Sequence, residues 1–364
     1  MTERPFVDAV DVDQLPAEVW EPIAIRRAEI DAEIERLSEG PMPTNGRRES
    51  LIVHPSSVER GLGLAPGTEV RLSVLRPGES TTVKRHNATE VNFGIRGAGS
   101  VEVGSQRFDW TQYDVWNHPS WTSYRHHNDT DELSVRLTYS NAALLERMRV
   151  HLIDESPPEP NAAVSVEPVP VTIDAARISP FGTFQVTDAG AHLMPYETLI
   201  SPEPVDSRPL HWPWRTVQHH LDQLAALGSE YVGRRLYLLY NPRTGKTNGT
   251  TPSFFATITI RPPGISDKPH RHVSSAINYY FRGHGYSRVA GRKYDWEAGD
   301  LMLSAPGWAI HNHASGDEPV YELTVQDQPL NIAMESLLWQ EDLKEPPILL
   351  GANTGFATNR VALV

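Results

Sequence analysis

The sequence predicts an all-β protein built from two β domains of the same fold, with a helical arm before the first domain and a helix between the two. Three observations support this prediction. Short runs rich in Val, Phe, Tyr and Thr, separated by Pro-Gly and Gly-x-Gly turns, fill two stretches of the 364-residue chain and are typical of consecutive strands. The second stretch repeats the pattern of the first. Apolar residues at helical spacing precede each stretch.

The internal repeat defines the two β domains. The stretch RPGESTTVKRHNATEVNFGIRGAGSVEVGSQRFDW resembles RPPGISDKPHRHVSSAINYYFRGHGYSRVAGRKYDW. The matched pairs include His86 with His272, Gly97 with Gly283, and Trp110 with Trp296. All of these pairs share one offset along the chain, and a one-residue shift beyond Trp110 aligns Trp121 with Trp308. We therefore predict two copies of one β domain.

The expected domain boundaries follow from these patterns. Residues 1–62 are the helical arm, because isoleucines recur at helical spacing over 17–40 and Gly40-Pro41 ends the helix. The first β domain covers 63–155, and a Pro- and Glu-rich linker with the connecting helix covers 156–236. The second β domain covers 237–345, and 346–364 form a tail.

Composition excludes several classes of function. The net charge of −13 argues against nucleic acid or an anionic membrane as the main partner, since both require basic patches. The chain has no cysteine, so a bound metal must take imidazole or oxygen ligands. The N-terminus does not read as a signal peptide, and no apolar run of about 18 residues occurs, so we expect a cytoplasmic protein.

Histidine spacing in the second β domain predicts a metal site. In KPHRHVSSAIN, alternation along a strand sends His270 and His272 to one face. His311 follows on a later strand, which a hairpin can bring alongside. Three imidazoles of this kind form a facial set with open metal positions, which favours catalysis. His313 shares the face of His311, and we expect it to contact substrate or support the ligands; a bond to a backbone carbonyl is the alternative.

These motifs resemble the bicupin ring-cleaving dioxygenases of gentisate, salicylate and 1-hydroxy-2-naphthoate. The likeness is best from Arg208 to Val320, including YNPRTGKTNGTTPSFFATITIRPPG, HRHVSSAINYYFRGHG and APGWAIHNHASGDEPV. The resemblance implies a double-stranded β-helix (jelly-roll) barrel in each half, a non-haem Fe(II) held by three histidines, and a homotetramer. It also implies an extradiol-type, gentisate 1,2-dioxygenase-like reaction, in which O2 opens the ring of a small hydroxylated aromatic substrate.

The first barrel departs from the family's pattern. Family members usually hold the iron in the N-terminal barrel, but here Lys84 replaces the first histidine, Tyr124 falls at the third ligand position, and only His86 is kept. A cationic amine repels a metal ion and a neutral phenol binds it weakly. We therefore predict a degenerate first site and a metal in the second barrel. A set of His86, Glu90 and His126, or His127 in its place, is the open alternative.

Substrate contacts in the second barrel are predicted less directly. The candidates are Asn278, Tyr280, Trp308 and Arg288. Core packing is the alternative for the two aromatic residues, and an ordinary surface position is the alternative for Arg288. An arginine that the family uses in its N-terminal barrel to hold a substrate carboxylate corresponds to Asn92, and to Asn278 in the second repeat; neither amide can form that charge-assisted bidentate pair. Two further functions stay open: a lyase, decarboxylase or isomerase that uses Mn, Ni or Zn, and a non-catalytic bicupin that binds small molecules.

Overall fold

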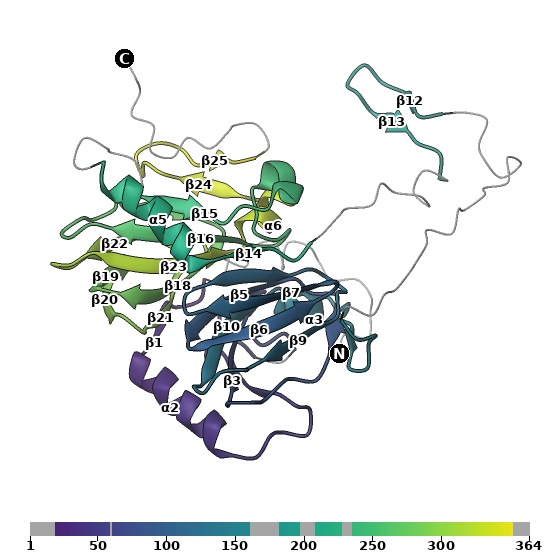
Figure 1. Ribbon diagram of the computed structural model, residues 1–364. Coiled ribbons are helices and arrows are strands. Elements are labelled where there is room, and N and C mark those ends of the chain that lie inside the picture. Colours follow the sequence, from purple (N-terminus) through teal and green to yellow (C-terminus); the bar gives the residue numbers. More distant parts are fainter. Residues whose placement is uncertain (1–18, 59, 161–181, 197–207, 228–234, 352–364) are drawn as a thin grey trace, which may run out of the picture.

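The computed structural model describes residues 19–58, 60–160, 182–196, 208–227 and 235–351. It confirms the all-β class, with two barrels side by side, the first in blue and the second in green (Figure 1). Each barrel combines a six-stranded sheet with a three-stranded sheet and a short additional sheet. The described helices are too short or too polar to cross a membrane.

The N-terminal barrel is formed by three sheets. The six-stranded sheet has the order β14 (His211–Trp212), β8 (Val115–His118), β5 (Glu90–Arg96), β10 (Ser134–Ser140), β3 (Glu69–Leu75) and β2 (Arg48–Ile52). The three-stranded sheet has the order β7 (Gln106–Thr111), β6 (Ala98–Val103) and β9 (Tyr124–His127). The short strand β4 (Arg85–His86) pairs with β11 (Ile153–Asp154), and the helix α3 (Ala142–Arg147) follows β10.

The C-terminal barrel repeats this arrangement, with one additional strand in its third sheet. The six-stranded sheet has the order β1 (Ile23–Ile25), β21 (Leu301–Pro306), β18 (Ser275–Arg282), β23 (Val320–Gln326), β16 (Phe255–Arg261) and β15 (Leu236–Leu238). The opposing sheet has the order β20 (Arg292–Glu297), β19 (His284–Val289) and β22 (His311–Ser315). The third sheet contains β17 (Arg271–His272), β24 (Leu338–Gln340) and β25 (Ile348–Leu349), and α6 (Gln328–Ala333) follows β23. The matching strand orders agree with the repeat in the sequence.

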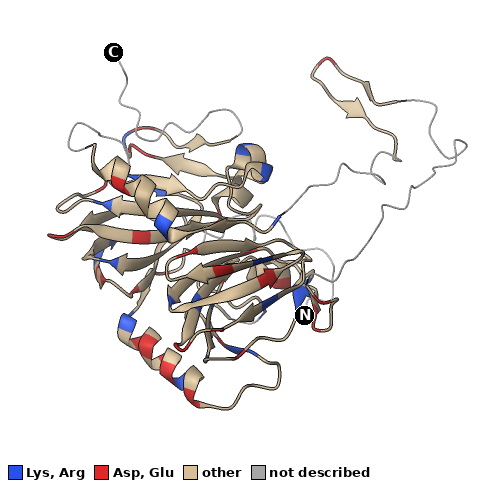
Figure 2. Cartoon of the chain, viewed as in Figure 1, with Lys and Arg blue, Asp and Glu red and all other residues tan. Residues whose placement is uncertain are grey.

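The two barrels exchange their first strands. Strand β1 precedes the N-terminal barrel in the chain but pairs with β21 of the C-terminal barrel. Strand β14 lies between the repeats and pairs with β8 of the N-terminal barrel. A helix follows each of them: α2 (Arg27–Glu39), whose exposed surface carries both acidic and basic residues (Figure 2), and α5 (Trp214–Ala225), the predicted connecting helix. Each repeat therefore begins with a strand that completes the other barrel.

Part of the expected helical arm is a strand. Ile23 and Ile25 pack against the apolar cluster between the barrels, whereas Ala24 faces the cluster inside the C-terminal barrel. This alternation has the period of a strand, and pairing with β21 overrides the helical spacing of the isoleucines. Strand β2 likewise lies within the predicted arm but extends the N-terminal sheet. Most of the predicted linker and tail, at 161–181, 197–207 and 352–364, lies outside the described residues.

Two aspartates at equivalent places in the two barrels bind the helices that follow the exchanged strands. Asp114 precedes β8 and accepts a hydrogen bond from the backbone amide of Trp214, at 2.6 Å, where α5 begins. Asp300 precedes β21 and accepts one from the amide of Arg27, at 2.8 Å, where α2 begins. A carboxylate at a helix start meets otherwise unpaired amides and the positive end of the helix dipole. These two contacts therefore fix each helix to the barrel that receives the preceding strand.

The largest apolar cluster lies between the barrels. Alternate residues of β18 divide between two surroundings: Tyr279 and Phe281 enter this shared cluster, whereas Tyr280 enters the interior of its own barrel. Phe93 of the N-terminal barrel packs against Tyr279 and Phe281, with ring centres 5.8 and 5.7 Å apart. Burial on both faces explains why β18 reads as a nearly continuous apolar run.

Candidate metal centre

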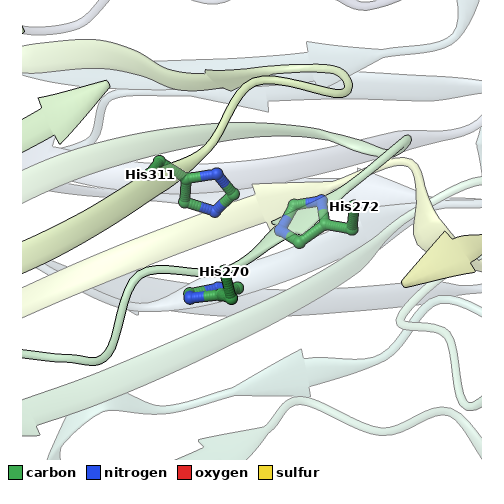
Figure 3. Close-up of side chains that lie close together, drawn as sticks. All are labelled: His270, His272 and His311. Atoms are coloured by element: carbon green, nitrogen blue, oxygen red, sulfur yellow. The ribbon is translucent and has the colours of Figure 1, made fainter. Parts of the chain in front are cut away.

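The three predicted ligands lie together in the C-terminal barrel. His270 lies just before β17, His272 ends that strand, and His311 begins β22; their rings gather around one point (Figure 3). The backbones of His270 and His311 exchange two hydrogen bonds, of 3.1 and 2.9 Å, so the two segments meet directly. One ligand nitrogen from each histidine lies within 4.8 Å of the others, and all three side chains are buried. Within the described ranges, this triad is the group with metal-ligand spacing.

Backbone carbonyls set the tautomer of each imidazole. The Nδ1 atoms meet the carbonyl oxygens of Lys268 for His270, Ser274 for His272 and Ala309 for His311, at 2.9, 2.8 and 2.9 Å. A carbonyl oxygen only accepts hydrogen bonds, so each ring carries its proton on Nδ1 and has its lone pair on Nε2. Three neutral imidazoles oriented by such bonds are the donor set that a divalent transition metal requires.

Trp339 forms a wall beside the triad. It lies opposite His272 in the pairing of β17 with β24. Its ring stacks on His272 at 4.8 Å and on His270 at 5.7 Å, with interplanar angles of 21° and 25°. The buried indole restrains both imidazoles and excludes water from one side of the site. Trp339 is not predicted from the sequence, because no motif links it to the histidines.

His313 lies beside the triad and is oriented by a side chain. Its ring centre is 5.8 Å from that of His311, and its Nδ1 is 2.8 Å from the hydroxyl of Ser287. The indole nitrogen of Trp296 also donates to Ser287, at 3.0 Å. The hydroxyl of Ser287 therefore holds both rings in place. For Nδ1 of His313, the observed partner is this hydroxyl and not the backbone carbonyl given above as the alternative. Ser287 was not identified from the sequence.

The side chains of β18 that face the barrel interior are hydrogen-bonded or stacked on other side chains. Tyr280 stacks on Trp296 with ring centres 3.8 Å apart, and burial raises the pKa of its phenol, which stays neutral. Asn278 donates to Thr324 at 2.8 Å and to Glu322 at 3.4 Å. Both side chains thus form part of the barrel wall. Their contact with a substrate stays a prediction.

The other two candidates face away from the triad. The ring of Trp308 lies 4.4 Å from the guanidinium of Arg271, which points to the opposite side of β17 from the histidines. Arg288 is exposed and lies 5.6 Å from the ring centre of Tyr286, whereas the neighbouring Ser287 is buried in the barrel. Alternation on β19 therefore places Arg288 on the outer surface. Substrate contact by these two residues stays a prediction, with no support from their positions.

The equivalent place in the N-terminal barrel has the same backbone and different chemistry. Lys84 and Tyr124 exchange two backbone hydrogen bonds, of 3.2 and 3.0 Å, as His270 and His311 do. The Nε2 atom of His86 lies 3.0 Å from both Glu90 and the Tyr124 hydroxyl. A ring nitrogen shared in this way is engaged in hydrogen bonds rather than directed at a metal position.

Glu90 is held between two imidazoles. One carboxylate oxygen meets His86, and the other meets Nδ1 of His118 at 2.7 Å. Burial opposes ionisation of this carboxyl, but His86 and His118 outweigh it and hold the pKa of Glu90 well below its usual value. Neither nitrogen of His126 has a hydrogen-bond partner among the described residues. In the part of the chain that the structure describes, His86, Glu90 and His126 do not form a group with metal-ligand spacing.

Comparison with known proteins places these findings in context. A family model described as the AraC-like ligand binding domain matches residues 255–358. The chain is 26% identical over 264 residues to 5-aminosalicylate 1,2-dioxygenase of Comamonas sp, which covers 71% of this chain and 64% of that protein. It is 27% identical over 312 residues to 1-hydroxy-2-naphthoate 1,2-dioxygenase of Nocardioides sp. (strain KP7), covering 83% and 73%. The chain thus matches less than two thirds of the first of these relatives.

The solved structures identify the fold. Salicylate 1,2-dioxygenase from Pseudaminobacter salicylatoxidans superposes with a TM-score of 0.68 at 18% identity, over 89% of each chain. The chain has the bicupin fold. The gentisate adducts of salicylate 1,2-dioxygenase superpose with a TM-score of 0.73 at 15% identity, over 92% of this bicupin and 89% of that chain. The similarity to the ring-cleaving dioxygenases that the sequence indicated is confirmed.

Proposed function

We propose that this bicupin is a non-haem Fe(II)-dependent dioxygenase that uses O2 to open the ring of a hydroxylated aromatic acid, with its active site in the C-terminal barrel. The observation that carries the proposal is the buried triad of His270, His272 and His311, each ring in the tautomer that a metal ligand needs. The names of the relatives, which are dioxygenases of 5-aminosalicylate and 1-hydroxy-2-naphthoate, support this reaction class.

The roles of the surrounding residues follow from their contacts. A bound Fe(II) would supply the redox chemistry for O2 and the polarisation of substrate oxygens. The triad would occupy one face of the metal and leave the others to substrate and O2. Trp339 restrains two of the ligands and keeps water from one side. His313, oriented by Ser287, would hold or transfer a proton at the substrate.

The cleavage position is a separate part of the proposal. The related enzymes are named as 1,2-dioxygenases of aromatic acids that carry a carboxylate next to a hydroxyl group. We place cleavage between the ring carbons that bear the hydroxyl and the carboxylate, in preference to the extradiol-type reaction expected from the sequence. Assembly into a homotetramer and a cytoplasmic location stay predictions.

The identity of the metal is also proposed. Three neutral imidazoles accommodate Mn, Ni or Zn as well as Fe(II), so the donor set alone does not select a redox metal. A lyase, decarboxylase or isomerase reaction is the second candidate for this reason. Anaerobic turnover with one of these metals would favour it.

The test is O2 uptake with a panel of substrates. Protein purified without oxygen and loaded with Fe(II) should consume O2 with at least one of gentisate, salicylate, 5-aminosalicylate and 1-hydroxy-2-naphthoate, and absorbance should report the ring-opened product. His311→Ala should reduce the rate by more than about 100-fold, because a ligand is lost outright. Tyr124→Phe, at the equivalent place in the other barrel, is the matched control and should keep most of the rate. No O2 uptake with any of these compounds would refute the proposal.

A further inference from the structure

The interior of the N-terminal barrel contains a buried lysine without a hydrogen-bonding partner. Lys84 is 6% exposed, and its amine makes no hydrogen bond or ion pair with any residue in the part of the chain that the structure describes. The amine lies 5.8 Å from the ring centre of Tyr124. Burial lowers the pKa of Lys84, and Glu49 opposes that shift. An ammonium on a largely buried side chain that meets no acceptor in the protein is costly, so it indicates a missing acceptor.

The carboxylates nearby are already engaged by other groups. Glu90 meets His86 and His118, Glu49 meets Arg71 and Arg136, and Glu69 meets Arg71. These distances range from 2.5 to 3.4 Å. Each carboxylate therefore has a cationic or imidazole donor of its own. Lys84 lies near these carboxylates but makes no direct contact with any of them.

Two further donors face the same interior without an acceptor. The side-chain amide nitrogen of Asn92 and the Nε of Arg136 are buried and have no hydrogen-bond partner among the described residues. Asn278 and Glu322 occupy the equivalent places in the pairing of β18 with β23, and there the amide donates to the carboxylate at 3.4 Å. Arginine in place of glutamate turns this acceptor into a donor. The N-terminal interior is thus donor-rich where the C-terminal one is balanced.

We infer that the interior of the N-terminal barrel binds a small carboxylate anion without a metal ion. A carboxylate offers two oxygens with about four lone-pair directions, so one group can meet the amine of Lys84 and the donors of Asn92 and Arg136 together. The stacked rings of His118 and Tyr124, with centres 4.2 Å apart, provide an aromatic border for the organic part. The same donors repel a metal ion, which is why the site differs in kind from the histidine triad. The inference does not depend on the function proposed above.

Calorimetric titration of the full chain tests this site separately from the metal centre. The His272→Ala variant, treated with a chelator, is titrated with sodium acetate, sodium benzoate and sodium chloride at constant ionic strength. We expect about one carboxylate per chain, bound equally well by the wild type and by His272→Ala. Lys84→Met should weaken this binding at least about tenfold, because it removes a charge-assisted contact and keeps the side-chain volume. Lys293→Met, which changes an exposed lysine paired with Asp295, is the control and should bind normally.

A second variant covers the case in which Lys84→Met does not fold. Asn92→Asp supplies a carboxylate inside the barrel, so it should raise the midpoint of thermal unfolding without ligand and abolish the further rise that acetate or benzoate gives the wild type. Saturable binding that survives in Asn92→Asp, binding that disappears in His272→Ala, binding of chloride alone, or no saturable binding would each overturn the inference. Absence of metal or of O2 uptake would leave it standing, because the titration uses protein without the metal centre.

Discussion

The two barrels have the same backbone at the same place and opposite chemistry there. A pair of backbone hydrogen bonds joins Lys84 to Tyr124 in the first barrel and His270 to His311 in the second. In the second barrel the side chains converge as neutral imidazoles, whereas in the first they join a network of charged groups. The comparison teaches that the fold supplies the positions and that a few interior residues decide between a metal and an ionic network.

The two barrels also differ in whether a hydroxyl, that of Ser287, is present to pair with the interior tryptophan and histidine. Ser287 satisfies both Trp296 and His313, and its counterpart in the first repeat is Val101. Because valine offers no acceptor, the equivalents Trp110 and His126 have side-chain nitrogens without partners among the described residues. Burial also lowers the pKa of His126 well below its usual value, so its ring is neutral. The first barrel therefore keeps the histidine and the tryptophan but lacks the residue that orients them.

The largest expected effect comes from replacing Trp339, which forms a wall of the metal site, by the residue found at the equivalent place in the first barrel. Trp339 occupies the position that Ile153 occupies opposite His86, and Ile153 is half exposed. We expect Trp339→Ile to raise the metal dissociation constant by about 10- to 100-fold, the range seen when outer groups that orient ligands are lost. Competition with a chromophoric chelator measures the constant. Ile153→Ala is the matched control, and an equal effect of the two variants would contradict the account.

A smaller effect is expected at the hydroxyl that orients His313. Ser287→Val introduces the residue of the first barrel and removes the buried hydroxyl that contacts Trp296 and His313. We expect kcat/KM to fall about tenfold with metal content unchanged, and the free energy of unfolding to fall by about 2 kcal/mol. The reciprocal Val101→Thr should stabilise the protein by about 1 kcal/mol, since it supplies a partner to Trp110 or His126. Urea unfolding of both variants checks the pair, and stabilisation by Ser287→Val would break the comparison.

The smallest effect concerns a carboxyl that the first barrel replaces with an amide. Asp327 accepts a hydrogen bond from the amide of Ser275 at 2.8 Å, as Asn141 accepts one from Thr89 at 2.9 Å. Burial raises the pKa of Asp327 to about 7, above its value in an unfolded chain, so the folded protein binds this proton more tightly. The stabilisation that the protonated Asp327 gives the folded protein is therefore present at low pH and is lost as the pH rises toward 7.

Asp327→Asn should remove this pH dependence and keep the hydrogen bond to Ser275. Between pH 5 and 8 the wild type should lose about 2 kcal/mol relative to the variant, which is below the limit set by the full shift. Urea unfolding at both pH values, on metal-depleted protein, measures the difference. Parallel losses in the two proteins would show that another group is responsible.

Local patterns in the sequence predicted the features that depend on spacing. The HxH pair and His311 were found because strand alternation and the internal repeat place them together, and both are visible in one dimension. The same alternation argues against Arg288, since its neighbours Ser287 and Val289 are the inward residues of β19.

Features that depend on contacts between distant strands were not predicted. The segment 23–25 was expected to be helical because its pairing partner, β21, lies in the other repeat, near the opposite end of the chain, and leaves no local sign. Trp339 and Ser287 were missed for the same reason, as each meets a histidine across a sheet. Register between strands far apart in the chain is set by the tertiary structure, which overrides the intrinsic preference of short segments.

The most direct test of the account is the metal content of three proteins purified without oxygen: the wild type, His272→Ala and His86→Ala. These two histidines occupy equivalent positions in the two repeats, so the pair compares the barrels at one place in the fold. The account predicts about one metal ion per chain in the wild type and in His86→Ala, and none in His272→Ala. Metal retained in His272→Ala but lost in His86→Ala would move the metal centre to the N-terminal barrel and contradict the central claim.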